Sequence, residues 1–459
     1  MILRDIPAGP RAIVGWRFLR AMQNDPVPFL TRVAREYGDI VQFRIGGQVL
    51  VLVNHPDMIR EMLVVQHRSF RKNQVLQRVK AVLGEGLFTS DGDLHRTMRH
   101  LSQPAFHRER IAAYADVMVA RSREMSDAWQ NGATIDIHAE MTRATLAVVA
   151  QTLFAADLEA EADAVGRAIT ELINLFPRAM NPVALAMMRL PIPARFRLRA
   201  AMEQLDGTIS GIIANGRASG ADRGDLLSML LFAQDEEGIG MTDAQLHDEI
   251  LTLLLAGHET TASALAWTWY LVAQHPAVAH EIHRVVDEVL GDRPATAQDY
   301  PQLRYLEMVV SEAMRLYPPA WIVTGDAIEE IDLDGWRVPE KALVLATQTV
   351  VHRDPRWWSD PDTFDPLRFT AEAIASRPKF AYFPFSSGPR VCIGEGFAWM
   401  ESVLMLATFS QRWAMEPVSR DVKTLASITL RPRDGIRVRL RERAPAPRAA
   451  PLQSAGAWA

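Results

Sequence analysis

The sequence lacks several features, and each absence excludes a class of protein. Cysteine occurs once in 459 residues, so no disulfide can form within the chain, and we expect a cytoplasmic protein. Apolar runs all fall short of the roughly 18 residues of a membrane span, and charges and prolines interrupt residues 1–20. We therefore expect neither a membrane anchor nor a signal peptide. The net charge is −5, so there is no basic excess to suggest nucleic acid as a partner.

Glycine-rich nucleotide-binding fingerprints are also missing. The chain contains no G-x-G-x-x-G, so a dinucleotide cofactor is not expected, and electrons for any redox reaction must come from another protein. His352-Arg353-Asp354 matches the H-R-D of a kinase catalytic loop, but no D-F-G accompanies it. We discard the kinase interpretation and expect this segment to be structural.

Helical periodicity dominates the remaining pattern, and a few short alternating stretches indicate strands, so the expected fold class is mainly α with small β-hairpins. Helices are expected at 142–154, 243–275, 303–316 and 395–413. Hairpins are expected at 41–53, at 331–338 and at 428–440, where Pro432 to Gly435 would form the turn. The segment 444–459 is rich in alanine and proline, and we expect it to be disordered.

The predicted helix 243–275 has the clearest boundaries. Thr242 and Gln245 form a capping-box pattern at its start, and Pro276 cannot continue it. At a rise of 1.5 Å per residue it would extend for roughly 50 Å, enough to cross the molecule.

The centre of this helix reads Ala256-Gly-His-Glu-Thr-Thr261, which is unusual for an apolar helix. A glycine there costs about 1 kcal/mol relative to alanine, and a threonine hydroxyl can bond a carbonyl one turn back and bend the helix. A solvated helix face is the alternative interpretation. Apolar residues flank the segment on both sides, which favours a functional one.

The single cysteine lies in the segment Phe385-Ser-Ser-Gly388-Pro-Arg390-Val-Cys392-Ile-Gly394. A lone cysteine is most often a small buried apolar residue, but the spaced residue types here favour a metal-ligating thiolate. The following helix would lower the pKa of the thiol through its dipole. The two glycines would let the backbone pass close to a flat ligand.

This loop resembles the haem-binding signature of the cytochrome P-450 superfamily, and the helix centre is similar to its A-G-x-D/E-T-T motif. The resemblance implies the cytochrome P-450 fold with haem b, and Cys392 as the axial thiolate, which favours O–O cleavage. It places Thr260 over the opposite haem face with Glu259 in the proton route. Ala256 and Gly257 would give haem and oxygen clearance. Since these residues must face one cofactor, we expect one domain over 1–443.

Glu312 and Arg315 lie one helical turn apart, which by itself most often means a surface ion pair worth under ~1 kcal/mol. Together with the downstream Arg368 they are similar to the E-x-x-R network of the family. The resemblance implies a buried network behind the cysteine loop, which serves folding and haem retention.

The resemblance also implies the residues that hold the haem. His95 and Arg99 occupy the places of an aromatic and a basic propionate-binding residue, and Arg390 is a third partner, since guanidinium pairs well with carboxylate. An exposed basic helix is the alternative for His95 and Arg99. The remaining cofactor-binding residues are Phe385, Gly388 and Gly394. The chain has Thr324-Gly325-Asp326 where many relatives carry a further basic residue.

The expected substrate pocket is apolar, and ordinary core is the alternative for each residue taken singly. Its lining residues are Phe88, Ala320, Trp321, Ile322, Val323 and Ile428. The segment 172–190 would form a lid. Shape discriminates poorly between similar apolar molecules, so we expect a small molecule such as a terpenoid, a steroid or a fatty acid.

The resemblance therefore predicts a monomeric haem-thiolate monooxygenase that uses O₂. Electrons would come from a ferredoxin or flavodoxin with its reductase, docking near Cys392, where Arg96 and Arg108 add positive charge. One alternative is a haem-thiolate enzyme that uses or rearranges peroxides, although such relatives often lack an acid–alcohol pair like Glu259-Thr260. The other alternative is a haem sensor without catalysis.

Overall fold

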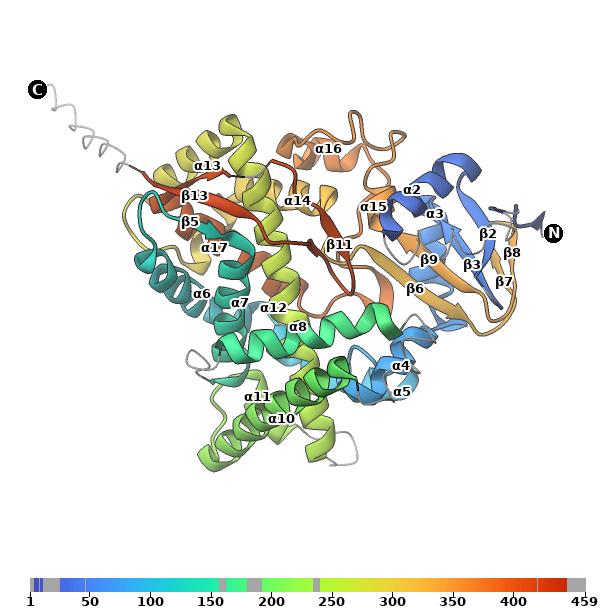
Figure 1. Ribbon diagram of the computed structural model, residues 1–459, viewed down its shortest axis with the longest axis horizontal. Helices are drawn as coiled ribbons and strands as arrows, with labels where there is room; N and C mark the ends of the chain where they lie inside the picture. Colours follow the sequence, from blue (N-terminus) through green and yellow to red (C-terminus); the bar gives the residue numbers. More distant parts are fainter. Residues whose placement is uncertain are drawn as a thin grey trace, which may run out of the picture.

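The computed structural model describes residues 4–7, 9–10, 25–45, 47–156, 162–179, 192–233, 240–418 and 420–443. The tail 444–459, residue 46 of the first predicted turn and positions 180–190 of the predicted lid lie outside these residues. Helices fill most of the molecule, and the largest sheet lies at one side of it (Figure 1). Within the part of the chain that is described, no helix is both long and apolar enough to cross a membrane.

The helices follow one another as α2 Pro26–Tyr37, α3 Pro56–Arg60, α4 Gln74–Leu83, α5 Gly92–Ser102, α6 Arg108–Ala128, α7 Ile137–Phe154, α8 Ala162–Ala179, α10 Pro193–Ser219, α11 Leu226–Phe232, α12 Asp243–Gln274, α13 Pro276–Val289, α14 Arg304–Leu316, α15 Gln348–Val351, α16 Ala371–Ala375 and α17 Glu395–Arg412. The four helices predicted from sequence are therefore present as α7, α12, α14 and α17. The strands are β1 Arg4–Asp5, β2 Ile40–Ile45, β3 Gln48–Val53, β4 Phe70–Arg71, β5 Thr134–Asp136, β6 Ile322–Ala327, β7 Ile331–Leu333, β8 Trp336–Val338, β9 Leu343–Thr347, β10 Trp413–Pro417, β11 Thr424–Ala426, β12 Leu430–Pro432 and β13 Arg437–Glu442.

The helix α12 runs through the middle of the molecule (Figure 1). It starts at the predicted capping box, in which Thr242 accepts from the backbone N–H of Gln245 and the Gln245 side chain accepts from the backbone N–H of Thr242. Helices α7, α14 and α17 pack against it. The main apolar core extends from Val79 to Leu440 and includes residues of all four helices. The polar centre of α12 therefore lies deep inside the protein.

The strands form one five-stranded sheet, ordered β2-β3-β9-β6-β4, and three smaller ones. The smaller sheets are β1-β8-β7, β10-β13-β5 and the two-stranded β11-β12. Two predicted hairpins are confirmed, namely β2 with β3 and β7 with β8. Asp334 and Gly335 make the second turn at positive φ.

The third predicted hairpin is wrong, because its two strands belong to different sheets. Leu430–Pro432 pairs with Thr424–Ala426, whereas Arg437–Glu442 pairs with β10 and β5. The cause lies in the intervening turn. Gly435 has φ +75°, and a Cβ there would lie 2.0 Å from the Asp136 carboxylate, which also accepts from the Ile436 N–H at 3.0 Å. These contacts direct the chain towards β5.

Candidate functional site

Cys392 lies in the short connection between a single 3₁₀ turn, Gly388–Arg390, and the start of α17. Its backbone N–H donates to the Phe385 carbonyl at 3.0 Å, which closes the loop, and the Phe385 ring packs on Trp399. Cys392 is exposed, and its apolar neighbours Val391 and Ile393 are half-buried. The loop thus presents the thiol to a space that protein atoms do not fill.

Burial raises the pKa of the Cys392 thiol to about 11, against the opposing effects of the Gly394 N–H and of Arg99. The start of α17 lowers this pKa as predicted, through the Gly394 N–H, but burial has the larger effect and the net shift is upward. Loss of hydration outweighs the dipole, because hydration stabilises a thiolate more than the few backbone donors present do. A cation bound to the sulfur would favour the thiolate.

The centre of α12 also borders unfilled space. Residues 251–255 and 261–272 are buried, yet Ala256 is exposed and Thr260 is half-buried. The Thr260 hydroxyl donates to the Ala256 carbonyl at 2.7 Å, the bond to the preceding turn that the sequence predicted. A helix interior with an exposed alanine indicates a gap beside that turn.

Two of the predicted glycines lie against other parts of the protein. A Cβ on Gly257 would lie 3.0 Å from Val149, so this glycine makes room for α7. Gly388 has φ +70°, and its Cβ would lie 2.1 Å from the Leu63 carbonyl oxygen, so the close partner is protein backbone. Gly394 has more open surroundings, with a hypothetical Cβ 3.8 Å from the Phe106 ring and 4.0 Å from the Cys392 sulfur. A flat ligand could therefore approach the backbone closely at Gly394.

Glu259 is buried and bound to a segment that the sequence did not connect with it. Its Oε1 accepts from Thr429 Oγ1 at 3.1 Å and lies 3.8 Å from Arg431 Nη1. Arg431 belongs to β12, and Thr429 immediately precedes that strand. The acid thus points to the C-terminal hairpin, and its exposed fraction is 3%. Any proton transfer through Glu259 requires it to exchange these partners.

Beside the cysteine loop, basic side chains gather around one carboxylate. Arg99 Nη1 donates to the Val391 carbonyl at 2.7 Å, and Arg390 Nη2 donates to Asp91 Oδ1 at 2.7 Å. Burial lowers the pKa of His95 to about 4, and Lys72, Arg390 and Arg99 add to this effect through their positive charge. Positive charge is in excess here, which suits an anionic ligand with more than one carboxylate.

Lys72 is a member of this basic cluster that the sequence interpretation missed. Its Nζ donates to the carbonyls of Leu87 at 2.7 Å and Phe88 at 3.0 Å, and burial lowers its pKa to about 8. The signal that would have found it is a lone lysine just before the Asn73 cap of α4. The Asn73 side chain caps α4 by accepting from the Leu76 N–H.

The unusual Thr324-Gly325-Asp326 segment has a structural explanation. The Asn73 side chain donates to Thr324 Oγ1, and Asp326 accepts from the Gln74 N–H at 3.1 Å. Both contacts fix the first turn of α4. These positions on β6 therefore stabilise the start of α4, which follows Lys72 in the sequence.

The predicted Glu312, Arg315 and Arg368 network is present. Glu312 and Arg315 have no exposed surface, and Arg368 Nε lies 3.4 Å from Glu312 Oε1. The surface-pair alternative is thus wrong. Arg315 also donates to the carbonyls of His352 and Pro361, at 2.8 and 2.6 Å. The H-R-D segment therefore supplies one acceptor to this network, the His352 carbonyl, which agrees with the structural role expected for the segment.

The predicted pocket residues differ in accessibility. Phe88, Ile322, Val323 and Ile428 are half-buried and Ala320 is exposed, so they are able to border a ligand space. Trp321 is different, since it is buried in an apolar cluster and its indole donates to the Ser427 carbonyl at 2.9 Å. The structure makes it a support of the hairpin tip.

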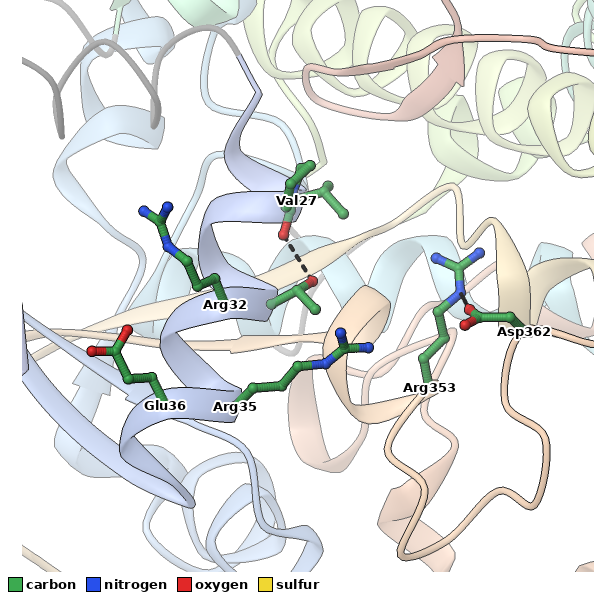
Figure 2. Close-up of a pocket in the computed structure, with 8 residues that line it drawn as sticks. Val27, Arg32, Arg35, Glu36, Arg353 and Asp362 are labelled. Atoms are coloured by element: carbon green, nitrogen blue, oxygen red, sulfur yellow. Dashed lines mark hydrogen bonds and ion pairs between the residues drawn. The ribbon is translucent and has the colours of Figure 1, made fainter.

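A groove of about 550 Å³ opens elsewhere, between α2 and a loop after α15. Figure 2 shows Arg32, Arg35 and Glu36 on one side of it, and the ion pair of Arg353 with Asp362, 3.4 Å apart, on the other. Its lining includes none of the predicted site residues. We therefore assign it no part in the chemistry of Cys392.

Glu401 on α17 is a second buried acid that the sequence interpretation overlooked. It has no exposed surface, and burial raises the pKa of its carboxyl well above the usual range. The Thr261 hydroxyl lies beside it and opposes this shift without overcoming it. That hydroxyl already donates to the Gly257 carbonyl at 3.2 Å. Burial therefore favours the neutral form of Glu401, which lies next to the polar turn of α12.

Comparison with known proteins agrees with this geometry. The family description that matches, over residues 7–438, is Cytochrome P450. The chain is 40% identical over 401 residues to cyclooctatin synthase of Streptomyces melanosporofaciens, covering 86% of this chain and 87% of that protein. It is 33% identical over 444 residues to pentalenene oxygenase of Streptomyces avermitilis, covering 95% and 97%. A crystal structure of the cytochrome P450DA heme domain matches with TM-score 0.85 at 27% identity, over 97% of this chain and 99% of that one.

Proposed function

The chain belongs to the cytochrome P450 family, and from that premise we propose that it oxygenates a cyclic terpenoid hydrocarbon. It is a haem-thiolate monooxygenase that uses O₂, an external redox partner and an apolar substrate. The relatives named cyclooctatin synthase and pentalenene oxygenase support the terpenoid class. The half-buried apolar residues Phe88, Ile322, Val323 and Ile428 suit such a molecule, because they offer contact area with few polar groups.

We assign the haem iron to Cys392. Haem, when bound, supplies the oxygen chemistry, and the chain supplies the ligand, the pocket and the protons. The single observation that carries the assignment is the exposed Cys392 in a loop that its own backbone N–H closes, by donating to the Phe385 carbonyl at 3.0 Å. Ala256, an exposed residue at the centre of α12, would face the same space from the opposite side.

The basic cluster would bind the haem carboxylates. Arg99, His95 and Arg390 were expected there, and we add Lys72, which stands beside the Thr324–Asp326 segment that lacks a basic residue. Phe385 and Gly394 would shape the loop, and Gly388 would hold its turn against Leu63. The Glu312 network would keep this loop in place from behind.

Thr260 and Glu259 would manage protons. The Thr260 hydroxyl donates to Ala256, so its oxygen retains lone pairs that can accept from a water or from the reacting oxygen. Glu259 would deliver protons after leaving Thr429 and Arg431. In such a pair, the acid can return a proton to the hydroxyl group after the hydroxyl has donated one. This favours oxygenation over peroxide rearrangement.

We also propose the finer features of the protein. A ferredoxin or flavodoxin would deliver electrons near the exposed Arg96 and Arg108. The chain would act as a monomer in the cytoplasm, which its single cysteine supports. Residues 1–443 would form one domain, as the core extending from Val79 to Leu440 suggests.

Two measurements test this function. The reduced, CO-bound protein should show the red-shifted Soret band of a thiolate-ligated haem, and Cys392→Ala should lose it while retaining the fold by circular dichroism. A survival of the band in Cys392→Ala contradicts the ligand assignment. A library of cyclic terpenes, steroids and fatty acids, screened by haem spin-state shift and by turnover with a surrogate ferredoxin system, tests the substrate class. Turnover of steroids or fatty acids without turnover of any terpene contradicts that class.

A further inference from the structure

The segment from Ser427 to Arg431, at the tip of the β11–β12 hairpin, joins parts of the protein that are distant in sequence. At one end, the Ser427 hydroxyl donates to the Ile173 carbonyl on α8 at 3.1 Å. At the other end, Thr429 and Arg431 contact the carboxylate of Glu259 on α12. Five consecutive residues therefore connect α8 with the acid.

The middle of the segment is also fixed by hydrogen bonds. The Leu430 N–H donates to the Pro319 carbonyl at 2.9 Å, and the Leu430 carbonyl accepts from the Trp267 indole at 3.0 Å. The Ser427 carbonyl accepts from the Trp321 indole at 2.9 Å. Because both indoles are buried, breaking either bond would leave a donor without water to replace its partner. The segment is therefore expected to move as one piece or not at all.

Ile428 is the exception in this segment, since its neighbours Ser427 and Thr429 are buried and it is half-buried. It is also a predicted pocket residue. An apolar molecule that displaces Ile428 would act on both neighbours at once, and these hold the α8 end and the Glu259 end. These contacts therefore connect the predicted pocket with α8 and with the Glu259 carboxylate.

We propose that residues 427–431 form a polar connector that couples the position of α8 to the orientation of the Glu259 carboxylate, with Thr429 and Arg431 as positioning residues. The proposal rests on the proposed part of Glu259 in proton supply. Thr429 and Arg431 hold the acid at the hairpin while α8 is held by Ser427. A shift of α8 or of Ile428 would loosen these bonds and free the acid to turn towards Thr260. Proton supply would then follow substrate entry.

Coupling between two sites is reciprocal, so a change in the contacts of Glu259 must also alter the stability of α8. In haem-loaded, substrate-free protein, we expect Thr429→Val and Arg431→Gln to speed hydrogen exchange of the α8 amides near Ile173 by at least about fivefold. Thr429→Val is the cleaner of the two variants, because the Thr429 hydroxyl donates to Glu259 on α12. Ser427→Ala should produce the same change directly. Ser122→Ala is the matched control, because that buried hydroxyl bonds only within α6, to Met118, and it should leave α8 unchanged.

Unchanged α8 exchange in Thr429→Val, with faster exchange in Ser427→Ala, overturns the connector. If Arg431→Gln fails to fold, Thr429→Val decides alone, since it keeps the side-chain shape and removes one hydrogen bond. The proposed part of Glu259 is tested apart from this, by the ratio of product to reductant consumed in Glu259→Gln. An unchanged ratio removes Glu259 from proton supply. The α8 exchange of Thr429→Val still decides whether the connector exists.

Discussion

Arg315 binds Glu312 through two parallel hydrogen bonds in a place without solvent, with Nε 2.7 Å from Oε2 and Nη2 2.8 Å from Oε1. The two residues lie one turn apart on α14. Helix α13 carries the same spacing and the same two-point geometry in Glu281 and Arg284, but there the pair is exposed. The chain therefore contains both a buried and a surface version of one ion pair.

Glu312→Ala should sharply reduce the yield of folded, haem-loaded protein. Removing one partner of a buried ion pair costs ~3–5 kcal/mol, because the other charge is left without a partner and without water. The Asp365 N–H, which donates to Glu312 Oε1 at 2.9 Å, loses its acceptor as well. Thermal unfolding and haem content per protein measure the effect. The control Glu281→Ala should change neither, since water replaces the lost partner. Equal behaviour of the two variants would contradict a structural network.

Gly388→Ala should displace the cysteine loop. The residue has φ +70°, which strains any side chain by about 1–3 kcal/mol, and the new methyl would overlap the Leu63 carbonyl oxygen. We expect a lower melting temperature and weaker haem retention, measured by haem transfer to apomyoglobin. Gly207→Ala in α10 is the control, because its surroundings are open. It should be neutral or stabilising by up to about 1 kcal/mol. Normal haem retention in Gly388→Ala would show that the loop tolerates a shift of Leu63.

Glu401→Gln should stabilise the protein increasingly as the pH rises. The pKa of Glu401 is raised in the folded protein, so the folded state keeps a proton that the unfolded state releases above about pH 4.5. The stability that this proton contributes is complete below that pH and is lost as the pH rises towards the folded pKa. Glutamine does not titrate and avoids the loss.

Denaturant unfolding of wild type and Glu401→Gln at pH 5 and pH 8 measures this difference. The gap in free energy of unfolding should widen in favour of the variant at pH 8. Glu416→Gln, at an exposed position on β10, is the surface control for the same substitution. A constant gap for Glu401→Gln would mean that the acid is ionised in the folded protein.

Local signals made parts of the fold predictable. The Thr242 cap and Pro276 delimit α12, and Asp334-Gly335 makes a hairpin, because each acts within a few residues of itself. The Glu312–Arg315 pair was also within reach, as one helical turn separates them. Their burial was not, since it depends on how His352 and Pro361 approach from elsewhere.

The features that could not be predicted depend on contacts between segments that are distant in the sequence. Arg431 pairs with Glu259 because a turn at Gly435 assigns β12 and β13 to different sheets. Gly257 needs its small size for Val149 on α7, which no spacing reveals. The sign of the Cys392 pKa shift was missed for a similar reason. The helix start is a local effect, whereas the desolvation that outweighs it comes from the whole surrounding fold.

Thr260→Ala should bind haem and substrate normally, consume reductant and yield less product. The half-buried Thr260 hydroxyl is the polar group of α12 beside exposed Ala256, so its loss removes the nearest site for a proton-donating water. Electrons should then appear as hydrogen peroxide, and the ratio of product to reductant should fall by at least about tenfold.

Thr268→Ala is the matched control, because Thr268 makes the same bond to the preceding turn, to Ala264 at 2.7 Å, but is fully buried. Loss of a helix-bending bond alone would affect both variants alike. An equal fall of the ratio in both variants would therefore assign the effect to helix shape. An unchanged ratio in Thr260→Ala would contradict a role of Thr260 in proton supply and would point to Thr261 or to water instead.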